Sequence, residues 1–393
     1  MATKTGSGFS RKENAVTAAR EAVSQALKNI TEGPPDIVIV FASTVYDLKA
    51  LLKEIRTASG ASTIVGCTTA GEFTELGPNT NSVEVMAVKS DNIIFEPVKV
   101  VGLKTNPAAL TNAVKDFQSQ CRAMSKKDYV HATVMMFIDP FLGDGEGMVN
   151  SLRQQIGAFG QVVGGAAGDD GKFIGSNLFY GDEVLSEAVV LVKIFSKNRI
   201  GIGAKHGMNN CTKPMHVTKS AGAVLHEIDG KPAFDAYLAF AKSRGVDLTR
   251  ESAPAFMMDH ELAIQAGFFT KIRAPFKANP DGSLQMAAEV PQGSMICIVD
   301  SDAKRLTQAA TEAAEEAKKN LGESTASGVL VFDCICRKTI LGSKFVDEID
   351  AIASVFAKDT PIVGFATYGE IAQYGGLFNG WHNSTSVVCA LPD

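Results

Sequence analysis

IVGCTTAGEF at residues 64–73 returns twice along the chain, as VVGGAAGD at 162–169 and as IVGFATYGEI at 362–371. Each copy has two β-branched residues, a glycine, several small residues, and then a glycine followed by a carboxylate. We call the three copies the first, second and third glycine motifs. Because an apolar run and a helical stretch precede each motif, the repetition predicts one supersecondary unit that is used three times.

The apolar runs stand at 37–41, 134–138 and 329–332. Continuous apolar runs of this length are typical of strands that are covered on both faces. Segments in which apolar and polar residues alternate follow the motifs, and they predict additional antiparallel strands. We therefore predict an α/β fold with mixed sheets and flanking helices, built from three similar strand–helix–strand units in two domains.

The expected domain boundary lies near Gly230, where a helix opens after a long β region. It separates a domain at 33–230 from one at 231–393. Residues 1–32 form an N-terminal segment with one helix.

Several local elements are also predicted. Residues 1–9 are small and polar, so we expect them to fray, and Ser10 with Glu13 forms a capping box for the first helix. One continuous helix is expected at 107–122, and an exposed helix at 303–320, which is rich in alanine, glutamate and lysine.

The composition is that of an ordinary globular protein, with 45% apolar and 21% charged residues. A net charge of −5 over 393 residues disfavours binding to nucleic acid or to a membrane surface. There is no apolar run of about 18 residues and no signal peptide at the start. Seven scattered cysteines do not suggest a secreted disulfide framework. We expect a cytoplasmic protein without membrane insertion.

Common catalytic signatures are missing from the sequence. There is no phosphate-binding G-x-x-x-x-G-K-[ST], and the glycines at 201–207 lack dinucleotide-binding spacing. Neither G-x-S-x-G nor H-E-x-x-H occurs. The chain is therefore expected not to be an enzyme.

The carboxylates of the motifs, Glu72, Asp169 and Glu370, are the first candidate ligand-binding residues. We expect them to converge on a pocket and to bind polar groups of a ligand. The alternative is that they only cap backbone amides at tight turns. The third motif adds a polar cluster, since it contains Tyr368 and is followed by His382 and Asn383.

A second candidate group ends the apolar run of the third unit. Ligands bind beyond the carboxyl ends of strands in open α/β sheets, and Asp333 stands at such an end. Cys334 and Cys336 could share a metal, form a redox pair or be inert buried thiols. Arg337 could bind a ligand carboxylate through two hydrogen bonds, or pair with Glu370.

Two further residues have competing interpretations. Cys67 lies inside the first motif and could be a nucleophile, although no histidine stands near it in the sequence. His206 lies in a glycine-flanked loop and could bind a cofactor iron or be solvated. No histidine pair has the spacing of a structural zinc site.

The ordered set of motifs resembles the FIST family of sensory proteins. The three glycine motifs carry this resemblance, together with DGKPA at 229–233, NPDGS at 279–283, Asp333-Cys334 and His382-Asn383-x-Thr385. The resemblance covers nearly the whole chain from about residue 35, and it implies a FIST N-like domain followed by a FIST C-like domain.

Family resemblance also implies a function. FIST proteins are described as intracellular sensors of small ligands, and a stand-alone branch resembles haem-based nitric oxide sensors that act on a separate histidine kinase or cyclic-di-GMP enzyme. By that analogy haem b is the cofactor and His206 its iron ligand. The expected ligand-binding residues are Cys67, Thr68, Glu72, Gly165, Asp169, Asp333, Cys334, Arg337, Tyr368, Glu370, His382 and Asn383.

Two other functions remain open on the sequence. One is an enzyme that uses Cys67 or Cys334 as nucleophile, with Glu72 or Glu370 as acid–base partner. The other is a scaffold in which the motifs serve only as turns.

Overall fold

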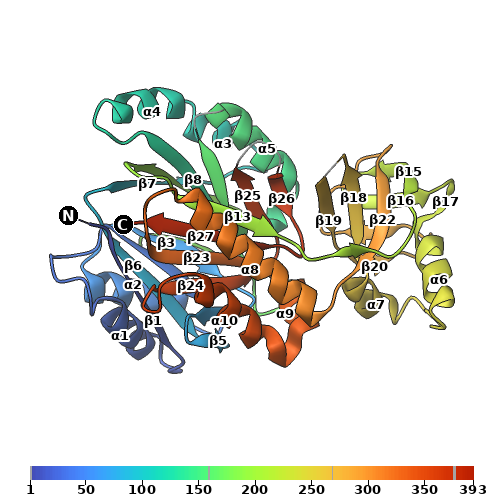
Figure 1. The fold of residues 1–393 in the computed structure, drawn as a ribbon, viewed down its shortest axis with the longest axis horizontal. Coiled ribbons are helices and arrows are strands. Elements are labelled where there is room, and N and C mark those ends of the chain that lie inside the picture. The colour runs from blue at the N-terminus through green and yellow to red at the C-terminus, as the bar shows by residue number, and fades with distance from the viewer. Residues whose placement is uncertain (1, 158–159, 268, 375–377) are drawn as a thin grey trace.

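Three strand–helix–strand units form the main body of the computed structural model, which describes residues 2–157, 160–267, 269–374 and 378–393 (Figure 1). Each unit contributes one pair of parallel strands: β2 (Ile37–Ala42) with β3 (Ile64–Thr68), β8 (His131–Ile138) with β9 (Gln161–Ala166), and β23 (Ala326–Cys334) with β24 (Ile362–Thr367). The connecting helices are α2 (Leu48–Ser59), α5 (Gly145–Ile156), and α9 (Ile335–Leu341) with α10 (Phe345–Val355). The α/β fold and the threefold repetition predicted from the motifs are confirmed.

After each motif the chain crosses into the sheet of another unit. β4 (Glu72–Thr74) leaves the first unit and pairs with β24 of the third. β25 (Glu370–Tyr374) leaves the third unit and pairs with β9 of the second. β10 (Leu178–Tyr180) follows the second unit and pairs with β3 of the first. The three units are thus joined cyclically.

The described residues place these strands in three six-stranded sheets, ordered β1-β6-β2-β3-β10-β11, β26-β25-β9-β8-β12-β7 and β13-β27-β23-β24-β4-β5. The strands not yet given are β1 (Lys4–Ser10), β5 (Gly77–Asn79), β6 (Val83–Lys89), β7 (Ile93–Val100), β11 (Glu183–Leu185), β12 (Val189–Ser196), β13 (Gly201–Lys205), β26 (Phe378–His382) and β27 (Ser386–Pro392).

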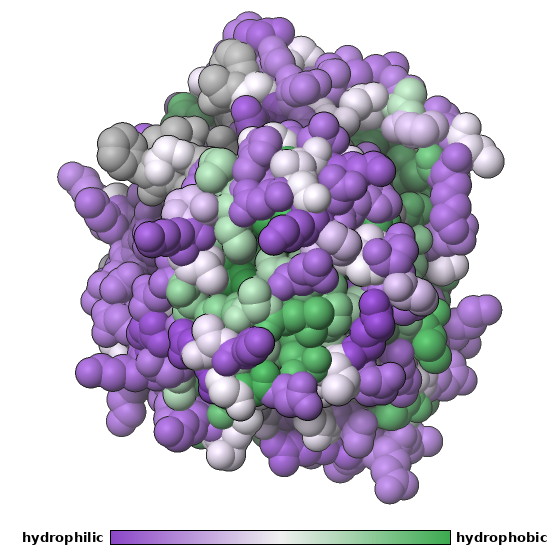
Figure 2. Space-filling view, turned by 90° about the vertical axis from the view of Figure 1, so that its right-hand side faces the viewer, coloured by the Kyte–Doolittle hydropathy of each residue, from purple (hydrophilic) through white to green (hydrophobic). Residues whose placement is uncertain are grey.

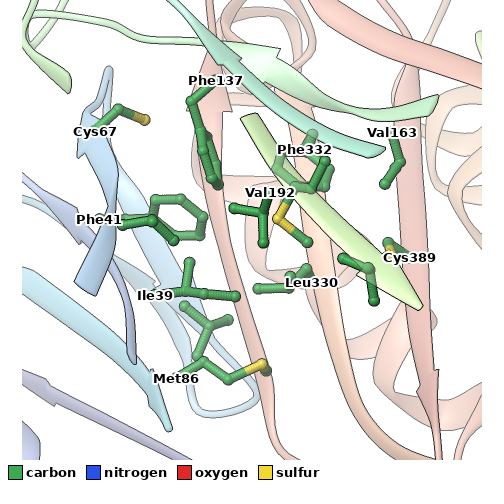
Figure 3. Packing of buried hydrophobic residues seen from close by; sticks show 14 of the residues in the cluster. Ile39, Phe41, Cys67, Met86, Phe137, Val163, Val192, Leu330, Phe332 and Cys389 are labelled. Carbon is green, nitrogen blue, oxygen red and sulfur yellow. The ribbon is translucent and has the colours of Figure 1, made fainter. Parts of the chain in front are cut away.

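One face of each sheet looks into a shared apolar interior (Figure 3). Phe41, Phe137 and Phe332 occupy matching places near the ends of the first strands of the three units. The ring centroids of Phe41 and Phe137 are 6.0 Å apart, and those of Phe137 and Phe332 are 6.3 Å apart. Burying these rings removes a large apolar area from water, which stabilises the association of the three sheets.

Helices cover the outer faces of the sheets. They are α1 (Ala15–Ala26) and α2 on the first sheet, α3 (Ala108–Ala113), α4 (Phe117–Ser125) and α5 on the second, and α8 (Ala303–Asn320) with α10 on the third. Among the described residues, no helix has both the length and the apolar character needed to cross a bilayer.

A separate sheet with its own core forms a second, small body between β13 and α8 (Figure 1, right). Its strands are β14 (Asn209–Asn210), β15 (Met215–Ala221), β16 (Val224–Ile228), β17 (Lys231–Pro232), β18 (Leu262–Ala266), β19 (Phe269–Arg273), β20 (Pro275–Ala278), β21 (Leu284–Met286) and β22 (Met295–Asp300), and its helices are α6 (Ala233–Ser243) and α7 (Ala253–Asp259). At this end of the molecule apolar side chains gather in the lower half of the face, with hydrophilic ones around them (Figure 2).

The N-terminal segment differs from its prediction. Residues 4–10 are not frayed but form β1, which pairs with β6. Gly6 and Gly8 let this strand lie against α1, since a Cβ on either would stand about 2 Å from a helix carbonyl (2.0 and 2.1 Å). Asn14, not Ser10, caps α1, by accepting a hydrogen bond from the Thr17 N–H.

Two predicted helices also differ. The helix expected at 107–122 is two helices, α3 and α4, because the chain turns at Val114 to bury both Val114 and Phe117. The helix at 303–320 is not simply exposed, since its alanine face is buried against β13. Gly203 makes this close approach possible: a Cβ there would lie 2.0 Å from the Ala313 carbonyl oxygen.

The contact between β13 and α8 gives a test of the packing. Gly203→Ala should destabilise the chain by roughly 2 kcal/mol, because the added methyl group must push the helix backbone away. Gly175→Ala is the matched control, since nothing lies within 4 Å of a Cβ at Gly175. Urea unfolding followed by circular dichroism measures both. Equal unfolding free energies for the two variants would contradict the close contact.

Candidate functional site

The three glycine motifs meet at one end of the main body, beyond the carboxyl ends of the parallel strands. Their backbones bond to one another: the Ala366 N–H donates to Gly71 O (2.7 Å), the Ala166 N–H to Gly369 O (2.7 Å) and the Gly168 N–H to Thr68 O (2.8 Å). The Thr68 hydroxyl also donates to Gly168 O (2.7 Å). These bonds close a ring of three turns. The expectation that the carboxylates of these turns converge on a pocket stays a prediction.

Below this ring the interior is packed. Phe365 of the third motif stands where the first has Cys67 and the second Gly165. Its ring centroid lies 4.4 Å from that of Phe41 and 5.8 Å from that of Phe332. Gly165 gives room for these neighbours, because a Cβ there would be 3.3 Å from Phe332 and 3.1 Å from Thr367.

The carboxylates of the first and third motifs have matching surroundings. Glu72 accepts hydrogen bonds from the hydroxyls of Thr69 and Ser82 (2.7 Å for Ser82). Glu370 accepts them from the Thr367 hydroxyl (3.1 Å) and the Thr385 N–H (3.0 Å). Burial raises the pKa of Glu72 to about 7 and the pKa of Glu370 well above its ordinary value.

Lys338 of α9 lies against the first motif. Its Nζ donates to Ala70 O (2.9 Å). Gly71, at a φ of 125°, leaves the space for this ammonium group, since a Cβ there would be 1.9 Å from Nζ. Burial lowers the pKa of Lys338, while the charges of Glu72 and Asp170 act in the opposite direction.

Asp169 of the second motif anchors a loop. Its carboxylate accepts the N–H groups of Phe173 (2.8 Å), Ile174 (2.7 Å) and Gly175 (3.0 Å) and the hydroxyl of Tyr368. Burial opposes its ionisation, but these hydrogen bonds, first that of Tyr368, outweigh burial and lower the pKa of Asp169. The carboxylate of the second motif thus differs in its surroundings from the other two, and the role of all three in binding a ligand stays a prediction.

A buried ionic cluster follows β23. The fully buried guanidinium group of Arg337 contacts both oxygens of Glu348 (3.1 and 2.7 Å) and lies 2.9 Å from Asp333 Oδ1. It also donates to the carbonyl oxygens of His206 and Leu306 (2.9 Å each). Arg337 therefore pairs with Glu348 rather than Glu370, and most of its donors are already used. Burial, with the charge of Glu348, raises the pKa of Asp333 well above its ordinary value.

Glu261 links the small body to the main body at this end. It precedes β18, is fully buried, and accepts a hydrogen bond from the Ser384 hydroxyl (2.5 Å). Burial raises the pKa of Glu261 to about 7, against the opposing hydrogen bonds of Ser384 and Cys336. A carboxyl group that titrates near neutrality thus lies at the junction of the two bodies.

Further polar contacts hold the same junction. Arg273 and Lys271 of β19 both pair with Glu146 of α5, and Arg273 also donates to Trp381 O (3.2 Å). Asn383 Oδ1 accepts the Ala274 N–H (3.3 Å). His382 lies beside them, and burial, with the charges of Lys271 and Arg273, lowers its pKa well below the ordinary value, so that it is neutral.

His206 follows β13 at the edge of the junction. Burial, assisted by the charge of Arg337, lowers its pKa to about 4, so the ring is neutral at pH 7. Nδ1 accepts the Met208 N–H (2.9 Å), which places the ring proton on Nε2. Gly207 is packed against α8, since a Cβ at this position would lie 2.8 Å from the Arg305 carbonyl oxygen. In this arrangement Nδ1 is engaged by Met208 and Nε2 carries the proton, so His206 does not fit a haem ligand without a rearrangement.

The proposed nucleophilic thiols lack the surroundings of reactive cysteines. Cys67 and Cys334 are both buried, and burial raises the pKa of each well above its ordinary value, with further increases from Glu72 at Cys67 and from Cys336 at Cys334. Reactive cysteines need a lowered pKa and access to solvent. Across the ranges that the structure describes, no group of three histidine, cysteine or acidic residues has the geometry to hold a metal ion.

Sequence reasoning did not find Glu261, Glu146, Arg273 or Ser384. Glu261 stands directly before the strand Leu262–Ala266, so a charge beside a mostly apolar strand was the available signal there, while Arg273 ends a strand of mixed residues and had no such signal. Their partners are more than 100 residues away in the chain, and only the folded arrangement connects them.

Comparison with known families agrees with this architecture. Residues 36–231 match the FIST N domain and residues 233–373 match the FIST C domain. The chain is a FIST-domain protein. FIST domains are associated with sensory modules of signalling proteins. The change from one domain to the next falls inside the small body, so its β15 and β16 belong to the first domain and its α6 to the second.

The relatives of this FIST protein do not add a defined activity. An uncharacterised protein of Methanocaldococcus jannaschii is 22% identical over 232 residues, which are 53% of this chain and 44% of that relative. The chain thus spans less than half of the length of the curated relative that it matches.

Two solved structures are similar over large parts of the FIST protein. A chorismatase matches with a TM-score of 0.37 and 8% identity over 100% of this chain and 99% of its own. The cyanuric acid hydrolase from A. caulinodans matches with a TM-score of 0.31 and 9% identity over 50% of this chain and 72% of its own. At these low scores neither match bears on what the FIST protein does.

Glu261 gives a pH-dependent stability that can be measured. Its pKa is about 7 when folded against 4.5 ordinarily, so the folded chain retains the proton more strongly and stability falls as pH rises between these values. The loss from this residue should be about 3 kcal/mol. Urea unfolding at pH 4.5 and pH 7.5 measures the free energy of unfolding at each pH. This free energy should fall less between the two pH values in Glu261→Gln than in the wild type. The same fall in both proteins would mean that Glu261 ionises normally.

Thiol labelling tests the reactivity of the buried cysteines. At neutral pH, iodoacetamide should label Cys67 and Cys334 much more slowly than free cysteine, because the thiolate is scarce and screened from solvent. Peptide mass spectrometry after timed labelling measures each site, with the urea-unfolded chain as control. Labelling at either site faster than free cysteine would revive the enzyme hypothesis.

Proposed function

We propose that this FIST protein is a non-catalytic sensor whose small ligand binds at the junction of the two bodies. The observation that carries the proposal is the position of Glu261, which extends from the small body and is buried against Ser384 and Cys336 of the main body. Asn383 and the pair of Arg273 with Glu146 lie at the same junction.

Such a junction can couple binding to movement. Polar side chains buried between two bodies stabilise their docking only while their partners are in place. A ligand that replaces one of these contacts binds docked and undocked arrangements with different affinity, and this difference is what shifts a population. The raised pKa of Glu261 leaves it able to donate a hydrogen bond to a ligand when protonated, or to accept a cationic group when ionised.

The signal would pass to a separate protein in this proposal. A histidine kinase or a cyclic-di-GMP enzyme is the partner that the family resemblance suggests. The haem and nitric oxide version of the proposal requires His206 to leave Met208 and turn a free nitrogen to the iron, so the junction ligand is favoured over haem.

Thermal-shift screening tests the sensor. Amino acids and other small metabolites are screened with the full chain, and at least one should raise the melting temperature, because a ligand that binds only the folded state stabilises it. The increase should be lost in Glu261→Gln and kept in Glu315→Gln, a surface variant far from the junction on α8. A broad library without any hit would support the scaffold instead.

Titration with haemin separates the cofactor version. We expect no Soret band that depends on His206, since the ring nitrogen is engaged by Met208. A Soret band in the wild type that is lost in His206→Ala would show that the loop rearranges to bind iron, and would restore the haem proposal.

A further inference from the structure

Three loops at the carboxyl ends of the parallel strands are tied together by aspartates outside the junction. Asp170 accepts the Thr44 N–H (3.1 Å), which joins the loop after β2 to the loop after β9. Asp139 accepts the Phe141 N–H (3.0 Å) and the Ser176 hydroxyl (2.9 Å), which joins the loop after β8 to the same segment. Together with the four hydrogen bonds of Asp169, these bonds link the three loops into one rim of the main body.

This rim exposes several large apolar side chains. Phe173 is 56% exposed and Ile174 is 81% exposed, although both stand in the loop that Asp169 holds. Val45 and Phe141 are exposed in the two loops tied to it. Exposed apolar residues that are gathered and held in place mark binding sites more often than scattered ones do.

Phe173 adopts an unfavourable backbone conformation. Its φ is 56°, in the left-handed region that bulky residues rarely adopt. Such a conformation persists only where the surroundings enforce it, as Asp169 does here through the Phe173 N–H. The ring stacks on Tyr368 with centroids 4.2 Å apart and planes 11° apart. One face of the ring thus packs on Tyr368, while the residue as a whole stays 56% exposed.

We propose that Phe173, backed by Tyr368 and held by Asp169, is a stacking platform that binds a planar aromatic small molecule at the rim of the main body. A ring that is already fixed loses little entropy when a ligand stacks on it, and an offset stack adds to the free energy of apolar burial. Ile174 and Phe141 supply apolar edges. Lys172, which precedes Phe173 in the chain, pairs with Asp170 at 3.2 Å.

Calorimetry with two matched acids tests the platform. The probes are 2-naphthoate and decahydro-2-naphthoate, which carry the same charge while only the first has an aromatic face. The full chain should bind 2-naphthoate about fivefold more tightly than the saturated acid. Phe173→Leu should bind 2-naphthoate about fivefold more weakly than the wild type, and Phe173→Tyr should retain the affinity.

Phe276→Leu is the matched control, because Phe276 of β20 is 53% exposed but stands in the small body and stacks on no other ring among the residues that the structure describes. It should leave binding unchanged. Unchanged near-ultraviolet circular dichroism and melting temperature establish that each variant folds. The proposal is overturned by no binding of 2-naphthoate at millimolar concentration, by equal affinity for both acids, or by equal loss in Phe173→Leu and Phe276→Leu.

This site is independent of the proposed sensor junction. Glu261→Gln should leave the affinity for 2-naphthoate unchanged, since Glu261 bonds to Ser384 and not to the rim. Binding of 2-naphthoate without any metabolite hit would therefore sustain the platform and reject the junction ligand, and the opposite result would do the reverse.

Discussion

The ring of backbone hydrogen bonds between the three glycine motifs is the constraint on which the main body depends. Each motif must end its parallel strand, turn, and enter the sheet of another unit while its N–H and C=O groups stay paired. Burying these groups unpaired would cost free energy at every turn. The exchanged strands satisfy them, as the bonds from Ala366 to Gly71 and from Ala166 to Gly369 show. Small residues are needed because three turns occupy the same space.

This constraint also explains the unusual carboxyl groups. A side chain that follows a turn of the ring is carried into the interior, where the charged form is poorly solvated. Glu72 and Glu370 compensate with a threonine hydroxyl three residues earlier in the chain, and Asp169 compensates with backbone N–H groups. Burial dominates at the two glutamates and raises their pKa values, while hydrogen bonds from the Tyr368 hydroxyl and from three backbone N–H groups outweigh burial at Asp169 and lower its pKa.

The small body is placed over this polar end, beside the third unit. Its contacts with the main body are both apolar and polar. Ala263, Ile272, Cys297 and Val299 share a hydrophobic cluster with α8 and β23, while Glu261 bonds to Ser384 and Arg273 pairs with Glu146. Polar contacts between bodies are easier to exchange with a ligand or with water than an apolar core is.

The sequence by itself determined the three repeated units, their parallel strands and the turns that end them. Apolar runs and glycine motifs are local patterns, and local patterns report local structure. It could not show β1, because the small polar residues there become a strand only through β6, about 80 residues further along in the chain. Only the tertiary structure decided which sheet receives each exchanged strand, that Arg337 pairs with Glu348, and that Glu261 reaches Ser384. The physical reason is that these choices are set by burial and by hydrogen-bond partners, and a residue acquires both only when distant segments are brought together.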